Sequence, residues 1–275
     1  MQNVFPEGRY ILIVLLMPFL IIPWINPVLI ALNPHGIAYW DEVIITYTYQ
    51  LVSILTLLLV MFLHKTSWQH MFQPFAQERL WPAVQLTLFI LVFSIAAAFV
   101  LFYPLSFLFP DFVQGWYLDI PPIIYLDGND FPIVANVLSF SSIVIITPVF
   151  EEFVFRGLLL HRWRDKWNLK KAAMVSSVLF GLLHFDPIGA TAFGLAMCYL
   201  YVKSGSLWLP IVCHMLNNLI AWLIELAYIT FDEDYGDYSI SDFQSEWYIG
   251  VAAILVVVVW IWYYMKRPSA DKASG

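Results

Sequence analysis

The chain has 275 residues, of which 61% are apolar and only 12% are charged. Water-soluble domains carry about twice that share of charged residues, so the composition excludes this class and indicates a polytopic membrane protein. The net charge of −7 and the lack of a basic stripe with interleaved aromatic residues exclude a nucleic-acid-binding protein.

Eight apolar runs approach or exceed the length of about 20 residues that a membrane-spanning helix needs. They cover residues 10–32, 43–63, 82–104, 133–160, 172–184, 188–203, 207–229 and 247–265. The fifth and sixth runs are short, and the turn between them, residues 185–189, is expected to lie inside the protein rather than in lipid. The predicted fold is therefore all-α, with about eight transmembrane helices.

The basic residues predict an orientation. If every run spans and the N-terminus is cytoplasmic, twelve of the 13 basic residues lie in cytoplasmic segments and the thirteenth, Arg156, lies in the membrane. The outer segments then contain no Lys or Arg and hold 13 of the 20 acidic residues; they are 33–42, 105–132, 185–187 and 230–246. By the positive-inside rule we expect an integral, multi-pass protein of a bacterial-type inner (plasma) membrane with both termini in the cytoplasm.

The chain divides into three parts by motif content. Residues 1–130 contain the first three helices and an outer loop without a recognisable motif. Residues 131–230 contain the fourth to seventh helices and every candidate site residue. Residues 231–275 contain an acidic outer loop, the last helix and a cytoplasmic tail. We expect the middle part to be the functional core.

The fourth apolar run contains the sequence FEEFVFRG from Phe150 to Gly157. Ionisable residues inside a membrane are costly and usually mark a functional site. Glu152 and Arg156 are four residues apart, so they share a helix face and can pair. Glu151 lies roughly 140° away from Arg156 around the helix and is left free for chemistry. The alternative is a buried ion pair that only fixes helix packing.

Two later helices carry further polar residues. Phe180 and His184 share a face in one, and His214 and Asn218 share a face in the other. A lone histidine in an apolar helix is more often a core residue than a catalyst, but two histidines, an asparagine and a free glutamate on neighbouring helices favour a site. At 1.5 Å per residue, Glu152, His214 and His184 lie ~15, ~10 and ~20 Å from the cytoplasmic edge, so these groups can meet.

Such a set of side chains supports peptide-bond hydrolysis. A carboxylate can take a proton from water while an imidazole holds that water, and a second histidine with an amide donor can stabilise the oxyanion. Alternatively, the carboxylate and both imidazoles could bind a catalytic zinc ion. The sequence contains neither HExxH nor GxSxG. Glu225 falls on the face of His214 and could line the outer end of a cavity or lie at the membrane interface.

The three motifs, in this order, resemble those of the CPBP family, which includes CAAX-prenyl-protease-2-like and bacteriocin-processing, Abi-type intramembrane proteases. The family pattern EExxxR, FxxxH and HxxxN stands here at residues 151–156, 180–184 and 214–218. The resemblance covers roughly residues 131–225. It implies an all-helical membrane fold with a conical cavity between the core helices.

The resemblance also implies residue roles. Glu151 would be the water-activating base assisted by His184, and His214 and Asn218 would serve the oxyanion. The supporting residues would be Glu152, Arg156 and Phe180. Family members have been described both as metalloproteases and as glutamate-dependent proteases. We favour the metal-free glutamic peptidase, because asparagine is a better oxyanion donor than zinc ligand; a zinc ion, if bound, would use Glu151, His184 and His214.

We therefore expect an intramembrane endopeptidase, in contact with membrane lipid, that cuts a peptide or lipopeptide near the cytoplasmic half of the bilayer. A second hypothesis is a non-proteolytic protein of the same fold that confers bacteriocin immunity or acts as a membrane scaffold. A third is a small transporter that uses Glu151 and Glu225 as a proton path. The sequence does not specify the oligomeric state or the role of Glu225.

Overall fold

The computed structural model describes residues 6–31, 38–128, 130–231 and 238–266, and within these ranges the chain forms helices and no β-strand. Among the described residues, six helices are long and apolar enough to cross a membrane. They are α1 (Gly8–Ala31), α2 (Ala38–Leu63), α3 (Leu80–Leu108), the continuous helix Ile133–Lys166, α10 (Trp208–Phe231) and α12 (Trp247–Lys266). The prediction of an all-α, polytopic membrane protein is confirmed.

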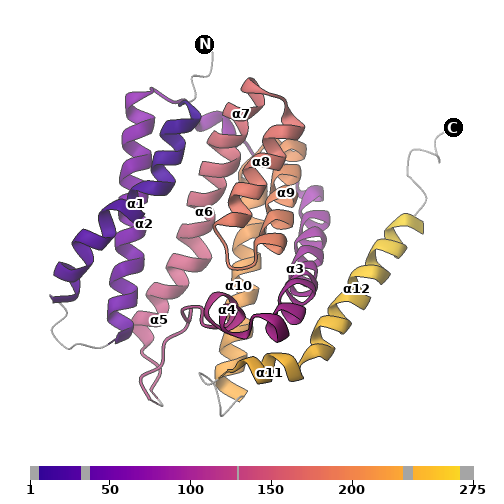
Figure 1. Cartoon of the computed structure of the whole chain (residues 1–275). Coiled ribbons are helices and arrows are strands. Elements are labelled where there is room, and N and C mark those ends of the chain that lie inside the picture. Colours follow the sequence, from indigo (N-terminus) through magenta and orange to yellow (C-terminus); the bar gives the residue numbers. More distant parts are fainter. Residues whose placement is uncertain (1–5, 32–37, 129, 232–237, 267–275) are drawn as a thin grey trace.

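The expected count of eight spanning helices is not confirmed, because the fifth and sixth runs form the shorter helices α8 (Leu169–Leu182) and α9 (Pro187–Ser204). At 1.5 Å per residue, α8 is roughly 20 Å long, which is less than a hydrocarbon core of about 30 Å. Figure 1 shows the pair as an antiparallel hairpin whose turn points into the bundle. If both ends of the hairpin lie on the same side of the membrane, every other helix keeps the orientation predicted from the sequence.

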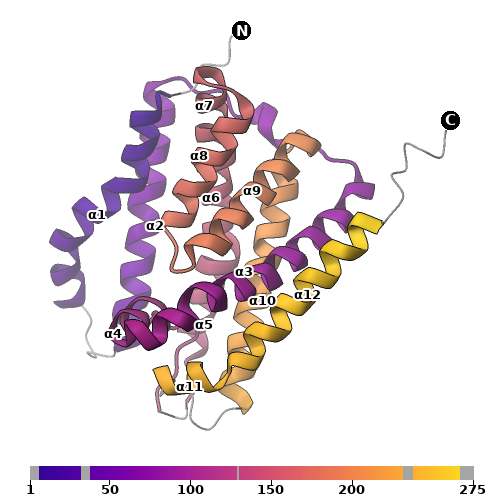
Figure 2. The same ribbon diagram turned by 45° about the vertical axis from the view of Figure 1, so that its right-hand side comes forward.

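The remaining helices flank this hairpin in pairs. Helices α1 and α2 pack together on one side of the bundle, and α3 and α12 pack together on the other (Figures 1 and 2). The helix Ile133–Lys166, the hairpin and α10 lie between the two pairs (Figure 1). The three predicted motifs are therefore carried by the central elements of the fold.

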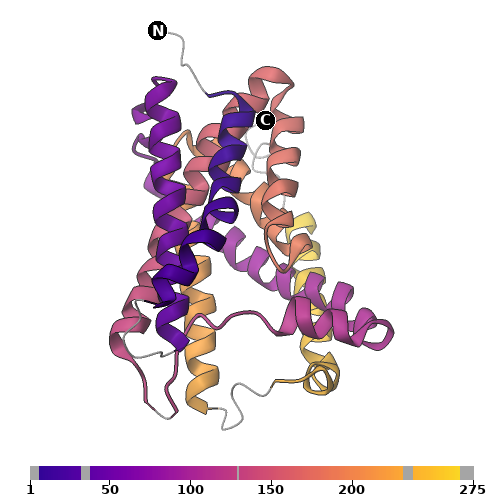
Figure 3. The ribbon, with the colours of Figure 1, turned by 60° about the vertical axis from the view of Figure 1, so that its left-hand side comes forward.

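Short elements lie at the end of the bundle opposite α7 (Figure 3). They are α4 (Pro110–Val113), the π-helical segment η3 (Gln114–Leu118) and α11 (Ile240–Ser245). Trp116 of η3 donates a hydrogen bond from Nε1 to the carbonyl oxygen of Phe185, at 3.1 Å, and its ring packs edge-on against Phe185. This segment therefore contacts the turn between α8 and α9.

The helix Ile133–Lys166 is not a regular α-helix. Its α-helical parts are α5 (Ile133–Phe140), α6 (Thr147–Glu152) and α7 (Leu160–Lys166), and two π-helical segments lie between them, η4 (Ser141–Ile146) and η5 (Phe153–Leu159). Such π-helical turns are rare and frequently lie at functional sites. Both adjacent glutamates are at the end of α6, directly between the two irregular segments.

Candidate active site

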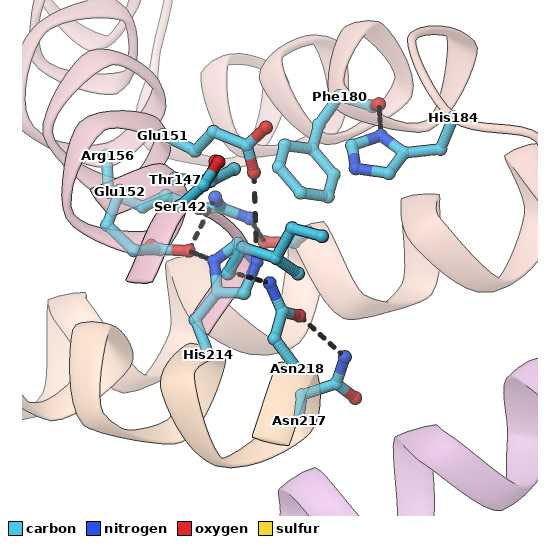
Figure 4. Close-up of polar contacts among 12 residues, drawn as sticks. Ser142, Thr147, Glu151, Glu152, Arg156, Phe180, His184, His214, Asn217 and Asn218 are labelled. Carbon is cyan, nitrogen blue, oxygen red and sulfur yellow. Dashed lines mark hydrogen bonds and ion pairs between the residues drawn. The ribbon is translucent and has the colours of Figure 1, made fainter. Parts of the chain in front are cut away.

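Glu152 and Arg156 form the ion pair expected from their spacing. Arg156 Nη1 donates to Glu152 Oε1 at 2.9 Å, and the two side chains are 0% and 1% exposed. Arg156 also donates from Nη2 to the carbonyl oxygen of Gly194, and its guanidinium lies 4.7 Å from the centre of the Phe180 ring. A buried charge is tolerated only with such partners, so these groups hold Arg156 in place (Figure 4).

His214 of α10 reaches the same glutamate. Its Nδ1 lies 2.8 Å from Glu152 Oε1, and because a carboxylate only accepts hydrogen bonds, Nδ1 carries the proton. Its Nε2 lies 3.7 Å from Glu151 Oε2, so the imidazole stands between the two glutamates (Figure 4). Phe193 packs edge-on against the imidazole, with 4.8 Å between ring centres. The sequence analysis did not anticipate this link between the first and third motifs.

Glu151 differs from its neighbour in both burial and hydrogen bonding. Its side chain is 20% exposed, and no group among the described residues donates a hydrogen bond to its Oε2. It lines a cavity of about 140 Å³ together with His184. Glu152 is thus held through Oε1 by Arg156 and His214, whereas Glu151 lines the cavity and has His214 Nε2 at 3.7 Å from its Oε2.

His184 lies just after the end of α8 and also faces this cavity. Its Nδ1 donates to the carbonyl oxygen of Phe180 at 2.7 Å, because a carbonyl oxygen can only accept. In the neutral ring, Nε2 is then an acceptor. Glu151 and His184 therefore both contribute hydrogen-bond acceptors to the residues that line this cavity.

Asn218 is placed by the irregular backbone of the fourth predicted helix. In the i→i−5 pattern of a π-helix, the carbonyl of Ile143 would pair with the N–H of residue 148, but Pro148 has none. Asn218 Nδ2 supplies the missing donor at 2.9 Å. Asn217 in turn donates to Asn218 Oδ1 at 3.3 Å, and neither asparagine lines the cavity that contains Glu151. Pro148 was the sequence signal for this contact.

The residues named as zinc ligands do not form a metal centre as they are placed. Across the described ranges, no three His, Cys, Asp or Glu side chains lie close enough together to hold a metal ion. The arrangement of Glu151, His184 and His214 therefore does not fit the three-ligand zinc site considered above, and no step below runs through a metal.

Glu225 has a different setting from the core glutamates. Its Oε1 accepts hydrogen bonds from the backbone N–H groups of Ile123 and Ile124, at 3.0 and 3.2 Å. It does not line the cavity that contains Glu151. Glu225 instead anchors the loop that precedes α5 from the C-terminal part of α10.

Sequence reasoning missed the contribution of α2. Tyr47 donates from its hydroxyl to the carbonyl oxygen of Leu138, and Gln50 donates from Nε2 to Ser142 Oγ at 2.6 Å. Both bonds attach α2 to the helix that carries the glutamates. The available signal was the polar stretch at residues 46–50, in which Tyr47 and Gln50 are three apart and so lie near one face.

Comparisons with known proteins concern the region that builds this site. Residues 133–220 match the model of the family described as "Type II CAAX prenyl endopeptidase Rce1-like". The "Putative membrane peptidase YdiL" of Bacillus subtilis (strain 168) is 32% identical over 85 residues, which are 30% of this chain and 35% of that protein. The "Uncharacterized 24.3 kDa protein" of Escherichia coli is 30% identical over 87 residues, 29% of this chain and 40% of that protein.

No solved structure matches the chain. The alignments span less than half the length of either curated relative. Within those limits, the family resemblance expected from the three motifs is confirmed for residues 133–220.

Proposed function

We propose, from the relation of residues 133–220 to type II CAAX prenyl endopeptidases, that this protein is an intramembrane endopeptidase. It would hydrolyse a peptide bond with water activated by Glu151. One observation carries the proposal. Glu151 and His184 line one cavity that Glu152 does not line, and Glu152 Oε1 is occupied by Arg156 and His214.

The first chemical step uses the two acceptors that face the cavity. A water molecule donates one hydrogen to Glu151 and the other to His184 Nε2, so that an oxygen lone pair points at the carbonyl carbon of the substrate. As the new C–O bond forms, Glu151 takes the proton. The proton then passes to the amide nitrogen, the C–N bond breaks, and an acid and an amine are released.

The negative charge that develops on the carbonyl oxygen needs donors. The second N–H of Asn218 Nδ2 is one, because only the first is used by Ile143. In its doubly protonated form, His214 donates from Nδ1 to Glu152 and from Nε2 to the oxyanion. Glu152 and Arg156 would act by holding His214 in this orientation.

The depth of Glu151 in the bilayer and the distribution of Lys and Arg indicate where the substrate would be cut. The distribution of Lys and Arg supports cytoplasmic termini, which would put Glu151 in the cytoplasmic half of the bilayer. The substrate we propose is a peptide or lipopeptide that enters from the membrane, such as a prenylated Cys-aliphatic-aliphatic-X tail. Membrane lipid would be the constant partner.

The experiment compares purified wild type with Glu151→Gln in lipid nanodiscs. Three peptides are offered: a prenylated Cys-aliphatic-aliphatic-X peptide, the same peptide with an unmodified cysteine, and an apolar helical peptide. Mass spectrometry in water enriched in oxygen-18 identifies the products. We expect wild type to cut and to introduce one heavy oxygen at the new carboxyl end, and Glu151→Gln not to cut.

Either of two results would contradict the proposal. Cuts that persist in Glu151→Gln would remove this residue as the base. Failure of folded wild type to cut any peptide would favour the non-proteolytic scaffold or immunity protein instead.

A further inference from the structure

Helix α2 presents polar residues to the helix that carries Glu151 and Glu152. Tyr47, Gln50 and Ser53 follow one another at intervals of three and so lie along one face. Tyr47 and Gln50 use this face to bind the backbone and hydroxyl groups of the helix Ile133–Lys166. Ser53 is next along the face, where the cavity begins.

The orientation of Gln50 is determined by its partners. Its Nε2 lies 3.3 Å from the carbonyl oxygen of Ser142, which can only accept, and 3.1 Å from Thr147 Oγ1. The amide nitrogen therefore faces the helix, and Oε1 faces away from it. Oε1 is buried and receives no hydrogen bond from the described residues, and Gln50 lines the cavity beside Glu151.

Ser53 is the most buried polar residue of the cavity wall. It is 2% exposed, and its hydroxyl makes no hydrogen bond within the described ranges. A buried hydroxyl without a partner is costly, and in a native protein it calls for an explanation. Gln50 and Ser53, which carry these two unpaired groups, line the same cavity as Glu151 and His184, where a substrate would be held.

We infer that Gln50 and Ser53 bind the main chain of the substrate beside the scissile bond. This inference rests on the proposed function and names two residues outside the matched region 133–220. Gln50 Oε1 accepts a backbone N–H, and the Ser53 hydroxyl donates to a backbone carbonyl oxygen. An extended residue offers one such donor and one such acceptor, and inside a membrane both need partners.

The other residues of the cavity wall indicate which substrate side chain can lie next to that main chain. It is mostly apolar, with contributions from α1, α2, the helix of the glutamates and the end of α8, and Tyr49 and Thr147 add two hydroxyl groups; the apolar residues are Leu15, Phe19, Ile54, Ile146, Phe150, Phe155 and Leu183. A cavity of about 140 Å³ with this lining suits an aliphatic side chain next to the scissile bond.

The test uses Ser53→Ala and a matched control on the same helix. The control is Thr56→Ala, because the Thr56 hydroxyl donates at 2.7 Å to the carbonyl oxygen of Val52 in its own helix turn. The probe is a fluorescent, prenylated Cys-aliphatic-aliphatic-X peptide in nanodiscs. Cleavage gives kcat and KM, and binding to the same variants made in the Glu151→Gln protein gives Kd without turnover.

We expect Ser53→Ala to raise KM and Kd about tenfold, the effect of one lost buried hydrogen bond, and Thr56→Ala to change both by less than twofold. A second measurement uses the unaltered protein. An ester in place of the amide beside the scissile bond removes the N–H that Gln50 would bind, and should weaken binding about tenfold, whereas an ester at a distant position should not.

The possible outcomes distinguish the binding of substrate by Gln50 and Ser53 from the proposed peptidase activity. Unchanged KM and Kd in Ser53→Ala, with cleavage that still requires Glu151, would overturn the inference and leave the peptidase intact. Binding that depends on Ser53, without any cleavage, would retain the peptide subsite and remove the peptidase. Absence of binding to every variant, or equal effects of both esters, would overturn the subsite.

Discussion

His214 Nδ1 lies 2.8 Å from Glu152 Oε1, although the two residues are 62 positions apart in the chain. The same oxygen accepts a hydrogen bond from Arg156 at 2.9 Å. Glu152 Oε1 is thereby paired with a guanidinium and an imidazole, while its Oε2 receives no hydrogen bond from the described residues, and the adjacent Arg156 charge makes Glu152 a poor candidate for a base. The relationship gives the two adjacent glutamates different surroundings, which agrees with the proposed roles of Glu152 in supporting His214 and of Glu151 in acting on water.

Replacing Glu152 by Gln should destabilise the fold. The change leaves the Arg156 charge buried without its carboxylate, and breaking a buried pair in this way costs about 3–5 kcal/mol. Unfolding of the purified protein by heat or denaturant in detergent measures the loss. Glu151→Gln is the matched control and should cost less than about 1 kcal/mol, because Oε2 of Glu151 makes no hydrogen bond to the described residues. Equal losses would contradict the division of roles.

Asn218→Ala should reduce kcat about 10²–10³-fold, the usual effect of removing one oxyanion donor. The neighbouring Asn217→Ala serves as control, since Asn217 only donates to Asn218 Oδ1 at 3.3 Å, and it should reduce kcat by less than about fivefold. Steady-state kinetics on folded protein distinguishes the two. Similar losses in both variants would show that Asn218 acts through local packing.

Removal of divalent metals should leave the rate of cleavage unchanged. The basis is the placement of Glu151, His184 and His214, which do not converge on one metal position in the described part of the chain. Activity is measured after dialysis against a chelator, and zinc content is measured by mass spectrometry of the purified protein. Loss of activity that added zinc restores would establish a metalloprotease.

Gly194→Ala should destabilise the contact between α8 and α9. A Cβ atom at Gly194 would lie 2.9 Å from Ser177 Cβ and 3.0 Å from Ser177 Cα, so the backbones would have to separate. Overpacking of this kind costs about 1–3 kcal/mol, and here it also disturbs the carbonyl that binds Arg156. Gly115→Ala, with nothing within 4 Å of the added atom, should show no such loss. Thermal unfolding compares them.

Glu225→Ala should loosen the loop before α5 without reducing catalysis directly. The change removes the acceptor of the Ile123 and Ile124 N–H groups. Hydrogen–deuterium exchange should become faster at these two amides and stay unchanged at the amides of α9. Loss of proton-coupled flux in Glu225→Ala proteoliposomes would instead support the transporter hypothesis.

Sequence periodicity was sufficient to predict an interaction whose two residues lie on one helix. The four-residue spacing of Glu152 and Arg156 predicted an ion pair, and the structure contains it. The length and composition of the apolar runs predicted a polytopic helical protein, and six helices meet these criteria in the described ranges. Short runs were less informative, because a run of 14 residues is consistent with either a spanning helix or half of a hairpin.

Contacts between helices required the tertiary structure. The link from His214 to Glu152, and the approach of Gln50 and Ser53 to the cavity of Glu151, join elements that are far apart in the sequence. By itself, the sequence determined which residues share a face of each helix, since 100° per residue follows from local hydrogen bonding. Only the tertiary structure decided which faces meet and at what depth, because these depend on how all the helices pack together.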